Sequence, residues 1–322
     1  MSIDIRIMRN FITVASTSSI SGAADLLHLA QPALSLQMKN LEQSLGVQLL
    51  ERTTRGVRLT ESGQRFLDHA MHLVRQFEIA CDDIREDAKS PRGSVVIGLP
   101  QSIAKQIVLP LVKDASVRYP HIQLGITELS TGYIPANILK GHLDLGFVFQ
   151  RDENPALRFE HIVDERLVII GAASLFARSG KTNRTLPELS VAELVATHSL
   201  VVPAKAHGLR ALIDYYLAPE LQALRILAEV NSIPQLVELV EAGLGCAILS
   251  HASVVSEIAS GRLSAAKIKG LKMRRPVYIV SSNGRPISAA TAVIHQMLHG
   301  LTRTLVNNKR WPATLVSPMK NG

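Results

Sequence analysis

The sequence predicts an α/β protein that begins with an all-α domain carrying a small β-hairpin and continues into a larger domain of two lobes. In the first 90 residues, apolar side chains recur mainly at helical spacing, and one short hairpin interrupts them. Beyond Gly93, apolar β runs alternate with helical stretches, a pattern typical of α/β layers with largely parallel sheets. Two small lobes joined by crossovers accommodate this many strands over residues 90–306 better than one sheet does.

The α/β region is predicted element by element from these runs. The predicted strands lie at residues 95–99, 122–127, 143–149, 167–171, 200–203, 226–230, 246–250 and 277–281. The predicted helices lie at residues 103–119, 209–217, 233–242 and 288–306. A polar tail with two prolines, residues 307–322, is expected to be flexible.

Composition limits the class of protein. The chain has 322 residues, 47% of them apolar, which suggests two or three units with a sizeable core. A formal net charge of +8 fits a polyanionic partner such as nucleic acid. Cys81 and Cys246 are too far apart for a disulfide framework or a zinc-ligand pattern, so we expect a reducing, cytoplasmic setting. The apolar run at 167–177 is too short to span a bilayer, so we expect no membrane association.

Residues 4–46 carry the signals of a helix-turn-helix. Apolar residues recur at helical spacing over 4–15, and Ser19 can cap a second helix. On the inner face of that helix, Ala23 and Ala24 are small enough for two helices to cross closely. Pro32 suits the first turn of a third helix, which Gly46 ends. The face of the third helix that is expected to point inward is formed by Leu34, Met38, Leu41 and Leu45.

A basic hairpin follows the third helix. Two short strands, at residues 47–52 and 57–60, are joined by a turn. The hairpin is crowded by three arginines with no acid between them, Arg52, Arg55 and Arg58. Arg55 at the tip is the strongest candidate for a phosphate or minor-groove contact, because either of the others could pair with Glu51 or Glu61. The helices and this wing predict a winged helix-turn-helix over residues 1–59 that binds double-stranded DNA.

One polar edge of the third helix has the chemistry of base recognition. Gln31, Ser35 and Lys39 lie at i, i+4 and i+8 and therefore share one edge. Glutamine can read adenine, serine can contact base or phosphate, and lysine can take guanine or phosphate. The alternative interpretation is a solvated polar face. Pro32 and the wing lie at the offsets that favour DNA contact.

Residues 60–89 predict a long linker helix, capped by Thr60 or Ser62. Its apolar positions form a near-heptad stripe of Phe66, Ala70, Leu73, Phe77, Cys81 and Ile84. A single exposed helix with such a stripe favours a partner helix, so we interpret it as a dimerisation element. The segment Ser90-Pro91-Arg92-Gly93 marks the boundary to the α/β region.

Polar side chains follow several of the predicted strands. Ser102 follows the strand at 95–99 and opens a helix, whose free N–H groups and dipole favour an anion. Thr131 occupies a similar place after the second strand. A plain N-cap for Ser102 and a turn residue for Thr131 are equally good interpretations. The residues that end other predicted strands and could line the same cleft are Phe149, Pro203 and Asn231.

The densest motif of the chain is Ala-Ala-Asp-Leu-Leu-His-Leu-Ala-Gln-Pro-Ala-Leu-Ser at residues 23–35. It is followed by Leu-Glu at 41–42, Leu-Leu-Glu-Arg at 49–52 and Leu-Thr-Glu-Ser-Gly at 59–63. Looser motifs continue at Gly-His-Leu-Asp-Leu-Gly, 141–146, and Glu-Ala-Gly-Leu-Gly, 241–245. Together these motifs resemble the LysR-type transcriptional regulators, and some α/β stretches are similar to the nitrogen-assimilation-control branch.

The resemblance implies a DNA-binding transcription regulator with a periplasmic-binding-protein-like domain over residues 90–306. A small-molecule effector in the interlobe cleft would change how a homotetramer, built from linker-helix homodimers, holds the promoter. It leaves RNA polymerase open as a further partner. Ser102 and Thr131 align with hydroxyl positions that the family uses for effectors, and Gln101 shares the context of Ser102. Leu36 stands where the family often has a basic residue, and it could touch a thymine methyl instead.

The remaining features carry little chemistry. His295 and His299 lie four residues apart on a predicted helix, but no third ligand is evident, so we expect surface histidines and no metal or cofactor. The basic run from Lys267 to Arg275 is expected to be a solvated loop, and both cysteines are expected to be inert. No catalytic motif is present, so an enzyme is not expected. A DNA-tethered enzyme and an architectural DNA binder that needs no ligand are the alternative functions.

Overall fold

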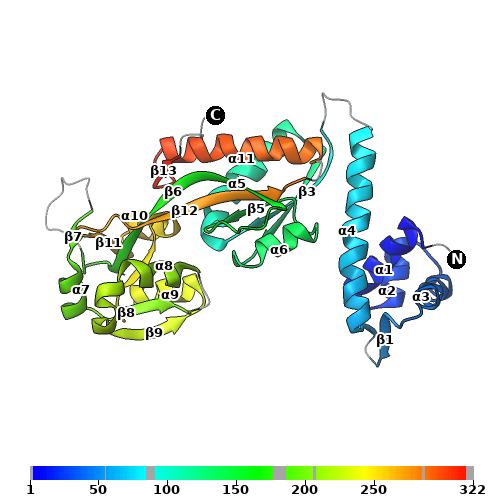
Figure 1. The fold of residues 1–322 in the computed structure, drawn as a ribbon, viewed down its shortest axis with the longest axis horizontal. Helices are drawn as coiled ribbons and strands as arrows, with labels where there is room; N and C mark the ends of the chain where they lie inside the picture. Colours follow the sequence, from blue (N-terminus) through cyan, green and yellow to red (C-terminus); the bar gives the residue numbers. More distant parts are fainter. Residues whose placement is uncertain are drawn as a thin grey trace.

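The computed structural model describes residues 3–54, 56–84, 91–176, 186–205, 208–284 and 287–316. A small helical domain stands at one end of the molecule, the long helix α4 runs beside it, and the α/β domain extends away from α4 (Figure 1). The N-terminal elements are α1 (Ile5–Thr17), α2 (Ile20–Leu27), α3 (Gln31–Leu45), β1 (Leu50–Thr53) and β2 (Gly56–Leu59).

Local capping chemistry sets the ends of the N-terminal helices. Asp4 and Ser19 each accept a hydrogen bond from an amide in the first turn of their helix, at 2.8 and 3.1 Å. Helix α3 begins without a side-chain cap and carries Pro32 in its first turn. Gly46 ends α3 at φ 68°, a left-handed conformation that glycine adopts without strain. The helix signals at Ser19, Pro32 and Gly46 are thereby confirmed.

The three helices and the start of α4 enclose a small apolar core. Phe11 is fully buried, and its ring meets that of Phe66 edge-on with centroids 5.1 Å apart. Ala23 and Ala24 are buried, which allows α2 to pack closely against its neighbours. The inward face of α3 is confirmed by the burial of Leu34, Met38 and Leu41. The polar edge of α3 consequently faces outward.

The wing strands β1 and β2 pair antiparallel, with Leu50 opposite Leu59. The first strand was predicted to begin at residue 47 but begins at Leu50. Glu42 Oε1 of α3 accepts hydrogen bonds from the amides of Leu49 and Leu50 at 2.8 and 2.9 Å. The segment before β1 is therefore tied to α3, and Thr60, which follows β2, also donates to the carbonyls of Gln48 and Leu49.

Helix α4 (Glu61–Ile84) begins at the predicted cap, because Thr60 Oγ1 accepts a hydrogen bond from the Gly63 amide at 2.9 Å. The predicted end near residue 88 lies outside the described residues. The predicted apolar stripe is divided in the structure. Its first members pack on the N-terminal core, whereas Leu73, Phe77 and Ile84 are 48%, 48% and 86% exposed. The exposed part is apolar surface on α4, and its role in dimerisation stays a prediction.

The other side of α4 contacts the α/β domain. Arg75 donates through Nε to Asp144 Oδ1 at 3.2 Å and through Nη2 to the carbonyl of Ser94 at 2.6 Å. Both side chains of this Arg75–Asp144 ion pair are largely buried. Lys140 reaches Asp68 of α4 at 3.0 Å. The linker helix is thus joined to the first lobe by two ion pairs.

The two lobes share one 16-residue strand, β6 (Leu157–Ala172). The first half of β6 pairs with β12 (Arg274–Ser282), and the second half pairs with β10 (Ala247–Ser250) and β11 (Leu263–Ile268). Parallel pairs join β3 (Gly93–Leu99) to β4 (Ile122–Glu128) and β5 (Leu145–Val148), and β8 (Leu200–Pro203) to β9 (Ile226–Val230). The arrangement is mixed rather than largely parallel, because these parallel pairs stand beside β6, whose described neighbours all run antiparallel to it.

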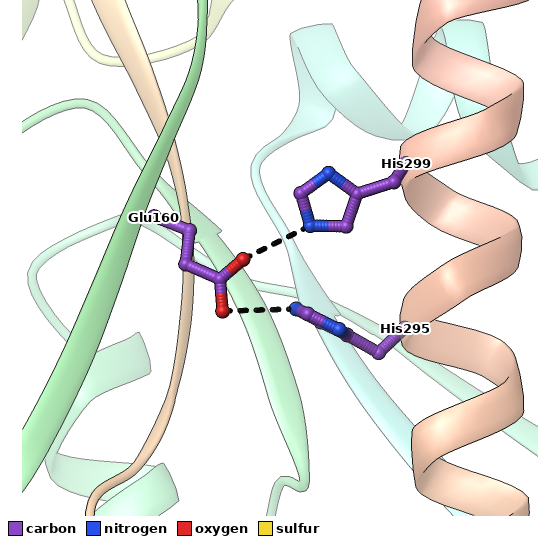
Figure 2. Close-up of side chains that lie close together, drawn as sticks. All are labelled: Glu160, His295 and His299. Carbon is purple, nitrogen blue, oxygen red and sulfur yellow. Dashed lines mark hydrogen bonds and ion pairs between the residues drawn. The ribbon is translucent and has the colours of Figure 1, made fainter. Parts of the chain in front are cut away.

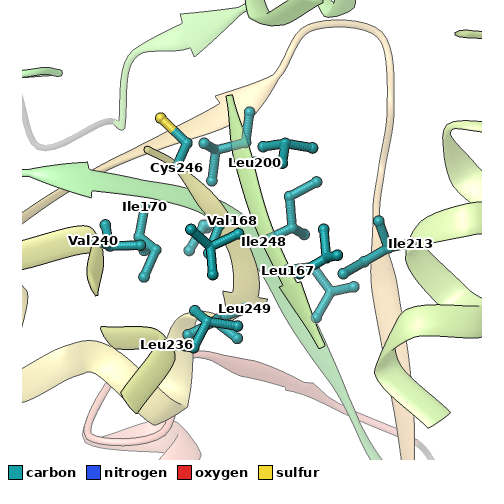
Figure 3. Packing of buried hydrophobic residues seen from close by; sticks show 14 of the residues in the cluster. Leu167, Val168, Ile170, Leu200, Ile213, Leu236, Val240, Cys246, Ile248 and Leu249 are labelled. Atoms are coloured by element: carbon teal, nitrogen blue, oxygen red, sulfur yellow. The ribbon is translucent and has the colours of Figure 1, made fainter. Parts of the chain in front are cut away.

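Helices complete each lobe around its own core. The first lobe contains α5 (Gln101–Arg118), α6 (Ile134–Leu139) and α11 (Ala289–Asn307), and the second contains α7 (Val191–Thr197), α8 (Gly208–Tyr216) and α9 (Ile233–Glu241). Shorter elements are β7 (Glu188–Leu189) and α10 (Val255–Ala259). In the second lobe, Val168 and Ile170 of β6 lie against Leu236 and Val240 of α9 (Figure 3). The first lobe has a separate apolar cluster, so the predicted two-lobed α/β fold is confirmed.

The first part of the tail does not match the prediction of a flexible segment over residues 307–322. Trp311 is fully buried, and its Nε1 donates to Glu165 Oε1 at 2.8 Å. Strand β13 (Ala313–Leu315) then pairs with β6. Residues 317–322 lie outside the described part of the chain. Among the described helices, none is both long enough and apolar enough to cross a membrane.

Candidate DNA interface and effector cleft

The predicted DNA-contacting residues of α3 lie together on one outward surface. Gln31, Pro32, Leu36 and Lys39 are exposed, and Ser35 is half-buried. The same residues line a shallow concavity whose opposite wall is formed by the wing. Leu36 is 57% exposed, so its methyl groups stand free beside the polar edge. Such a leucine cannot donate to guanine but can contact a thymine methyl.

The wing arginines occupy different environments. Arg52 donates to Ser35 Oγ at 3.1 Å, which places its guanidinium at the edge of α3. Arg58 pairs with Glu51 at 2.9 Å, with side chains 75% and 46% exposed, so one of the two predicted pairings exists. Arg55 lies outside the described residues. Arg52 is therefore the described wing arginine that is positioned to share a DNA surface with α3.

Glu42 belongs to this surface, although the sequence analysis named it only within the motif and gave it no role. Its carboxylate lies within a basic face, where it accepts hydrogen bonds from the Leu49 and Leu50 amides. This contact fixes the angle between α3 and the wing. The sequence signal for it was the Leu-Glu pair of the motif at residues 41–42.

A cleft of about 620 Å³ lies between the two lobes, at the carboxyl ends of β3, β4 and β9. This volume lies within the usual range of small-molecule sites, about 300–1,000 Å³. Five of the residues predicted for an effector site line it, namely Gln101, Ser102, Thr131, Phe149 and Asn231. They come from both lobes. The first and the last of them, Gln101 and Asn231, are 130 residues apart in the sequence.

Pro203 does not line the cleft. It is buried at the end of β8, and its carbonyl accepts a hydrogen bond from Arg210 at 3.3 Å. Arg210 in turn pairs with Asp214 and Glu229 at 2.8 Å each. The end of β8 is therefore closed by this arginine, which the position of Pro203 at a strand end did not reveal.

Two helices direct their N-termini to the cleft from opposite lobes. Helix α5 begins at Gln101 and Ser102, and helix α9 begins at Ile233 after Ser232. Neither helix has a side-chain N-cap hydrogen bond. Free N–H groups and the positive end of a helix dipole favour negative charge at such a position. Ser102 is thus not the plain N-cap that was the alternative interpretation.

Arg275 is a second residue whose role the sequence analysis did not recognise. It belongs to β12 and is only 4% exposed, so the expectation of a solvated basic loop is wrong for this residue. Its guanidinium pairs with the fully buried Glu165, donates to Ser102 Oγ at 3.3 Å, and lies 3.5 Å from the centre of the Phe149 ring. Two cleft residues are therefore positioned by one buried arginine. The sequence signal for its buried position was an arginine at the start of an apolar strand.

The cysteines take no visible part in these sites. Cys246 is fully buried, and burial raises the pKa of its thiol to about 11. A thiol that stays protonated at neutral pH is a poor nucleophile and a poor redox sensor. Cys81 is half-buried on α4.

Family models match both parts of the chain. Residues 5–64 match the bacterial regulatory helix-turn-helix protein model of the lysR family, and residues 88–302 match the LysR substrate binding domain. The second match alone covers more than half of the chain. The interval between the two matches, residues 65–87, contains most of α4.

Relatives of known name align along nearly the whole chain. The nitrogen assimilation regulatory protein nac of Klebsiella aerogenes is 28% identical over 95% of this chain and 98% of its own. A probable RuBisCO transcriptional regulator of Cyanidioschyzon merolae is 29% identical over 91% and 96%. The two match to a similar degree, so the resemblance is not specific to the nitrogen-assimilation branch.

Solved structures show the same fold at low sequence identity. A full-length OxyR variant from Pseudomonas aeruginosa has a TM-score of 0.68 at 21% identity, covering 99% of this chain and 100% of that one. Full-length CbnR complexed with its target DNA also has a TM-score of 0.68 at 21% identity, covering 93% and 100%. The named relatives are transcriptional regulators rather than enzymes. The chain belongs to the LysR family of bacterial transcriptional regulators.

Proposed function

We propose that this regulator reads promoter DNA with the outer edge of α3 and the wing, and that a small anionic effector binds in the interlobe cleft. The observation that carries the effector class is the pair of uncapped helix N-termini, α5 and α9, that face one cleft from opposite lobes. Arg275 adds a positive charge behind Ser102. An anion that contacts both helices favours the closed arrangement of the lobes.

Glu128 narrows the chemistry of the effector further. Its carboxylate is exposed and lies on the cleft lining, beside a region otherwise suited to anions. The part of an effector near Glu128 is then neutral or cationic, because two like charges at short distance repel. Organic acids and amino acids are the compounds to screen first.

The exposed stripe of α4 supports a homodimer. Two such dimers would form the homotetramer that we propose for this regulator. Leu73, Phe77 and Ile84 present apolar surface on a helix whose opposite face is already packed. The Arg75–Asp144 pair gives a direct route from the first lobe to α4. A change in lobe orientation would thereby alter the spacing of two DNA-binding domains.

Replacing Ser102 by alanine and Thr131 by valine is expected to weaken the effector response while DNA affinity stays nearly unchanged. The two hydroxyls line the cleft and lie far along the chain from α3. Each lost hydrogen bond to a charged group removes about 1.5–3 kcal/mol, or roughly 10- to 150-fold in effector affinity. The measurement is a thermal-shift screen of organic and amino acids, repeated on the variants with the best ligand.

Ser116→Ala is a matched control, because the hydrogen bond of this hydroxyl among the described residues lies within α5, to the Lys113 carbonyl at 3.0 Å. It should leave the effector response intact. Equal loss of DNA binding and effector response, or loss of neither, would contradict the cleft assignment. Turnover of the ligand would favour a DNA-tethered enzyme, and a footprint unchanged by every ligand would favour an architectural protein.

Arg52→Ala is expected to weaken binding to all DNA sequences alike. If a dimer neutralises about six to ten phosphates, affinity falls by about 10³- to 10⁵-fold between 50 and 200 mM salt. Loss of one phosphate contact per chain removes two contacts from the dimer, so the slope of log affinity against log salt should fall by about two. The readout is fluorescence anisotropy over a salt series. Lys113→Ala, an exposed lysine on α5, is the control, and a slope unchanged by Arg52→Ala would exclude the proposed contact.

A further inference from the structure

Three side chains outside the DNA interface and the cleft converge on one point of the first lobe. His295 and His299 come from successive turns of α11, and Glu160 comes from β6 (Figure 2). His295 Nε2 lies 3.3 Å from Glu160 Oε1, and His299 Nε2 lies 3.1 Å from Oε2. The ligand atoms of the three residues all lie within 4.8 Å of one another. The third ligand that the sequence did not show is therefore present in the fold.

The distances fit a small ion of tetrahedral preference. Zinc bonds to histidine nitrogen and carboxylate oxygen are about 2.0–2.2 Å long, which leaves neighbouring ligand atoms about 3.3 Å apart. The two nitrogen-to-oxygen separations lie near this value, but each runs to a different oxygen of the carboxylate, so the side chains must shift slightly to share one ion. The rings of His295 and His299 meet edge-on with centroids 4.8 Å apart, so both Nε2 atoms face the carboxylate without stacking.

The scaffold of the three residues is rigid. Glu160 lies two residues before Ile162, which packs in the same apolar cluster as Ile294 and Leu298 of α11, and the β6–β12 register shifts at Ile162. The side chains of His295, His299 and Glu160 are 21%, 40% and 24% exposed. The cluster thus lies at the margin of a packed core, partly shielded but open to an ion from solvent.

The competing interpretation is a set of hydrogen bonds without an ion. His295 and then His299, both donating to the carboxylate, hold the pKa of Glu160 far below its usual range. Arg158 also approaches Glu160 Oε1, at 3.2 Å, and supplies positive charge that competes with a cation. Its side chain is 66% exposed, so it can move into solvent when an ion enters. One histidine is enough to form an ion pair with Glu160. Here two histidine nitrogens lie beside the two oxygens of the same carboxylate, which is the arrangement of a set of metal ligands.

We propose that Glu160, His295 and His299 form a binding site for a zinc-class divalent cation that joins α11 to β6. Both imidazoles bind through Nε2 and keep their remaining proton on Nδ1. Imidazole and carboxylate ligands select zinc and its late first-row neighbours over magnesium, which prefers oxygen ligands only. Three protein ligands leave the fourth position of the ion to water.

The site would act on the shared strand of the two lobes. β6 runs through both lobes, and Glu160 lies in the half that belongs to the first lobe. An ion that joins this half to α11 stabilises the first lobe in its present packing. This site is separate from the effector cleft and needs no effector to be occupied.

The test is metal binding by the untagged, chelator-treated full-length chain. Titration calorimetry with Zn²⁺ should show one equivalent bound per chain, and Co²⁺ should give the visible absorption of a tetrahedral complex. Glu160→Gln and His299→Ala should each lower zinc affinity by at least about 100-fold, since even the loss of an outer-shell partner costs about 10- to 100-fold. Arg158→Ala should raise the affinity, because it removes the competing charge.

His161→Ala is the matched control. His161 pairs with Asp164 at 2.9 Å on the same strand and is similarly exposed, but it belongs to no three-ligand cluster among the described residues. It should bind zinc as the unmodified chain does, and Mg²⁺ should not compete in any variant. No zinc bound by the unmodified chain, or equal binding by the Glu160→Gln and His299→Ala variants, overturns the proposal. Circular dichroism of each variant establishes that a lost site is not a lost fold.

Discussion

Glu165→Ala is expected to lower the free energy of unfolding of the first lobe by about 3–5 kcal/mol, the usual effect of removing one partner of a buried ion pair. Glu165 is fully buried, and Arg275 is 4% exposed, directly opposite it in the β6–β12 register. The carboxylate also accepts from Trp311 Nε1 at 2.8 Å. The variant therefore leaves a buried guanidinium and a buried indole N–H without their acceptor.

The chain offers a local probe for this experiment. Trp311 is its one tryptophan, and it lies in the network itself, so its fluorescence during urea unfolding reports the first lobe. Asp114→Ala is the control, because the Asp114–Arg118 pair of α5 is about half exposed. Surface pairs of this kind contribute little. Equal urea midpoints for Glu165→Ala and the unmodified chain would mean that the network does not hold the lobe.

A double substitution separates charge from shape. Glu165→Leu with Arg275→Met removes both charges, and replacing a buried ion pair by apolar residues is often neutral or stabilising. We expect the double variant to be more stable than Glu165→Ala. Because Arg275 also positions Ser102 and Phe149, the double variant should bind the effector less well even if its stability recovers.

The N-terminal domain was predictable because its signals are local. The Ser19 cap, Pro32 in a first turn and the left-handed Gly46 act within a few residues of themselves, and each appears where the sequence placed it. The polar edge of α3 follows from helical spacing alone. The linker stripe was only partly predictable, since periodicity cannot tell which end of a helix finds its partner within the same chain.

The missed features depend on contacts between distant segments. The part of β6 that pairs with β12 contains Arg158, Glu160 and Glu165, charges that obscure a strand pattern unless their partners are known. Those partners lie more than a hundred residues away, at His299 and Arg275. The carboxylate of Glu165 also holds Trp311 in place. Because this contact is not visible in the sequence, the tail was predicted to be flexible. Burial of a charge becomes favourable only once its partner is in place.

Gly63→Ala is expected to destabilise the N-terminal domain by about 1–3 kcal/mol or more and to abolish DNA binding at temperatures where the unmodified chain binds. A Cβ at this position would lie 2.0 Å from the carbonyl oxygen of Leu49 and 2.9 Å from its carbonyl carbon. That carbonyl also accepts from the Thr60 amide at 3.0 Å, so it cannot move without releasing the start of α4 from the wing. The final glycine of the motif at 59–63 therefore has a packing reason.

Two effects oppose each other at Gly63, and their sizes decide the outcome. Alanine favours a helix over glycine by about 1 kcal/mol, but a backbone clash at this distance forces α4 away from β1. Gly22→Ala in α2 isolates the first effect, since its nearest neighbours would be Ser19 atoms at 3.5 and 3.6 Å. We expect the melting temperature, measured by circular dichroism, to be slightly higher for Gly22→Ala and much lower for Gly63→Ala than for the unmodified chain. If both variants gained stability, the close approach of α4 to the wing would not exist in solution, and the geometry of the DNA surface would need another basis.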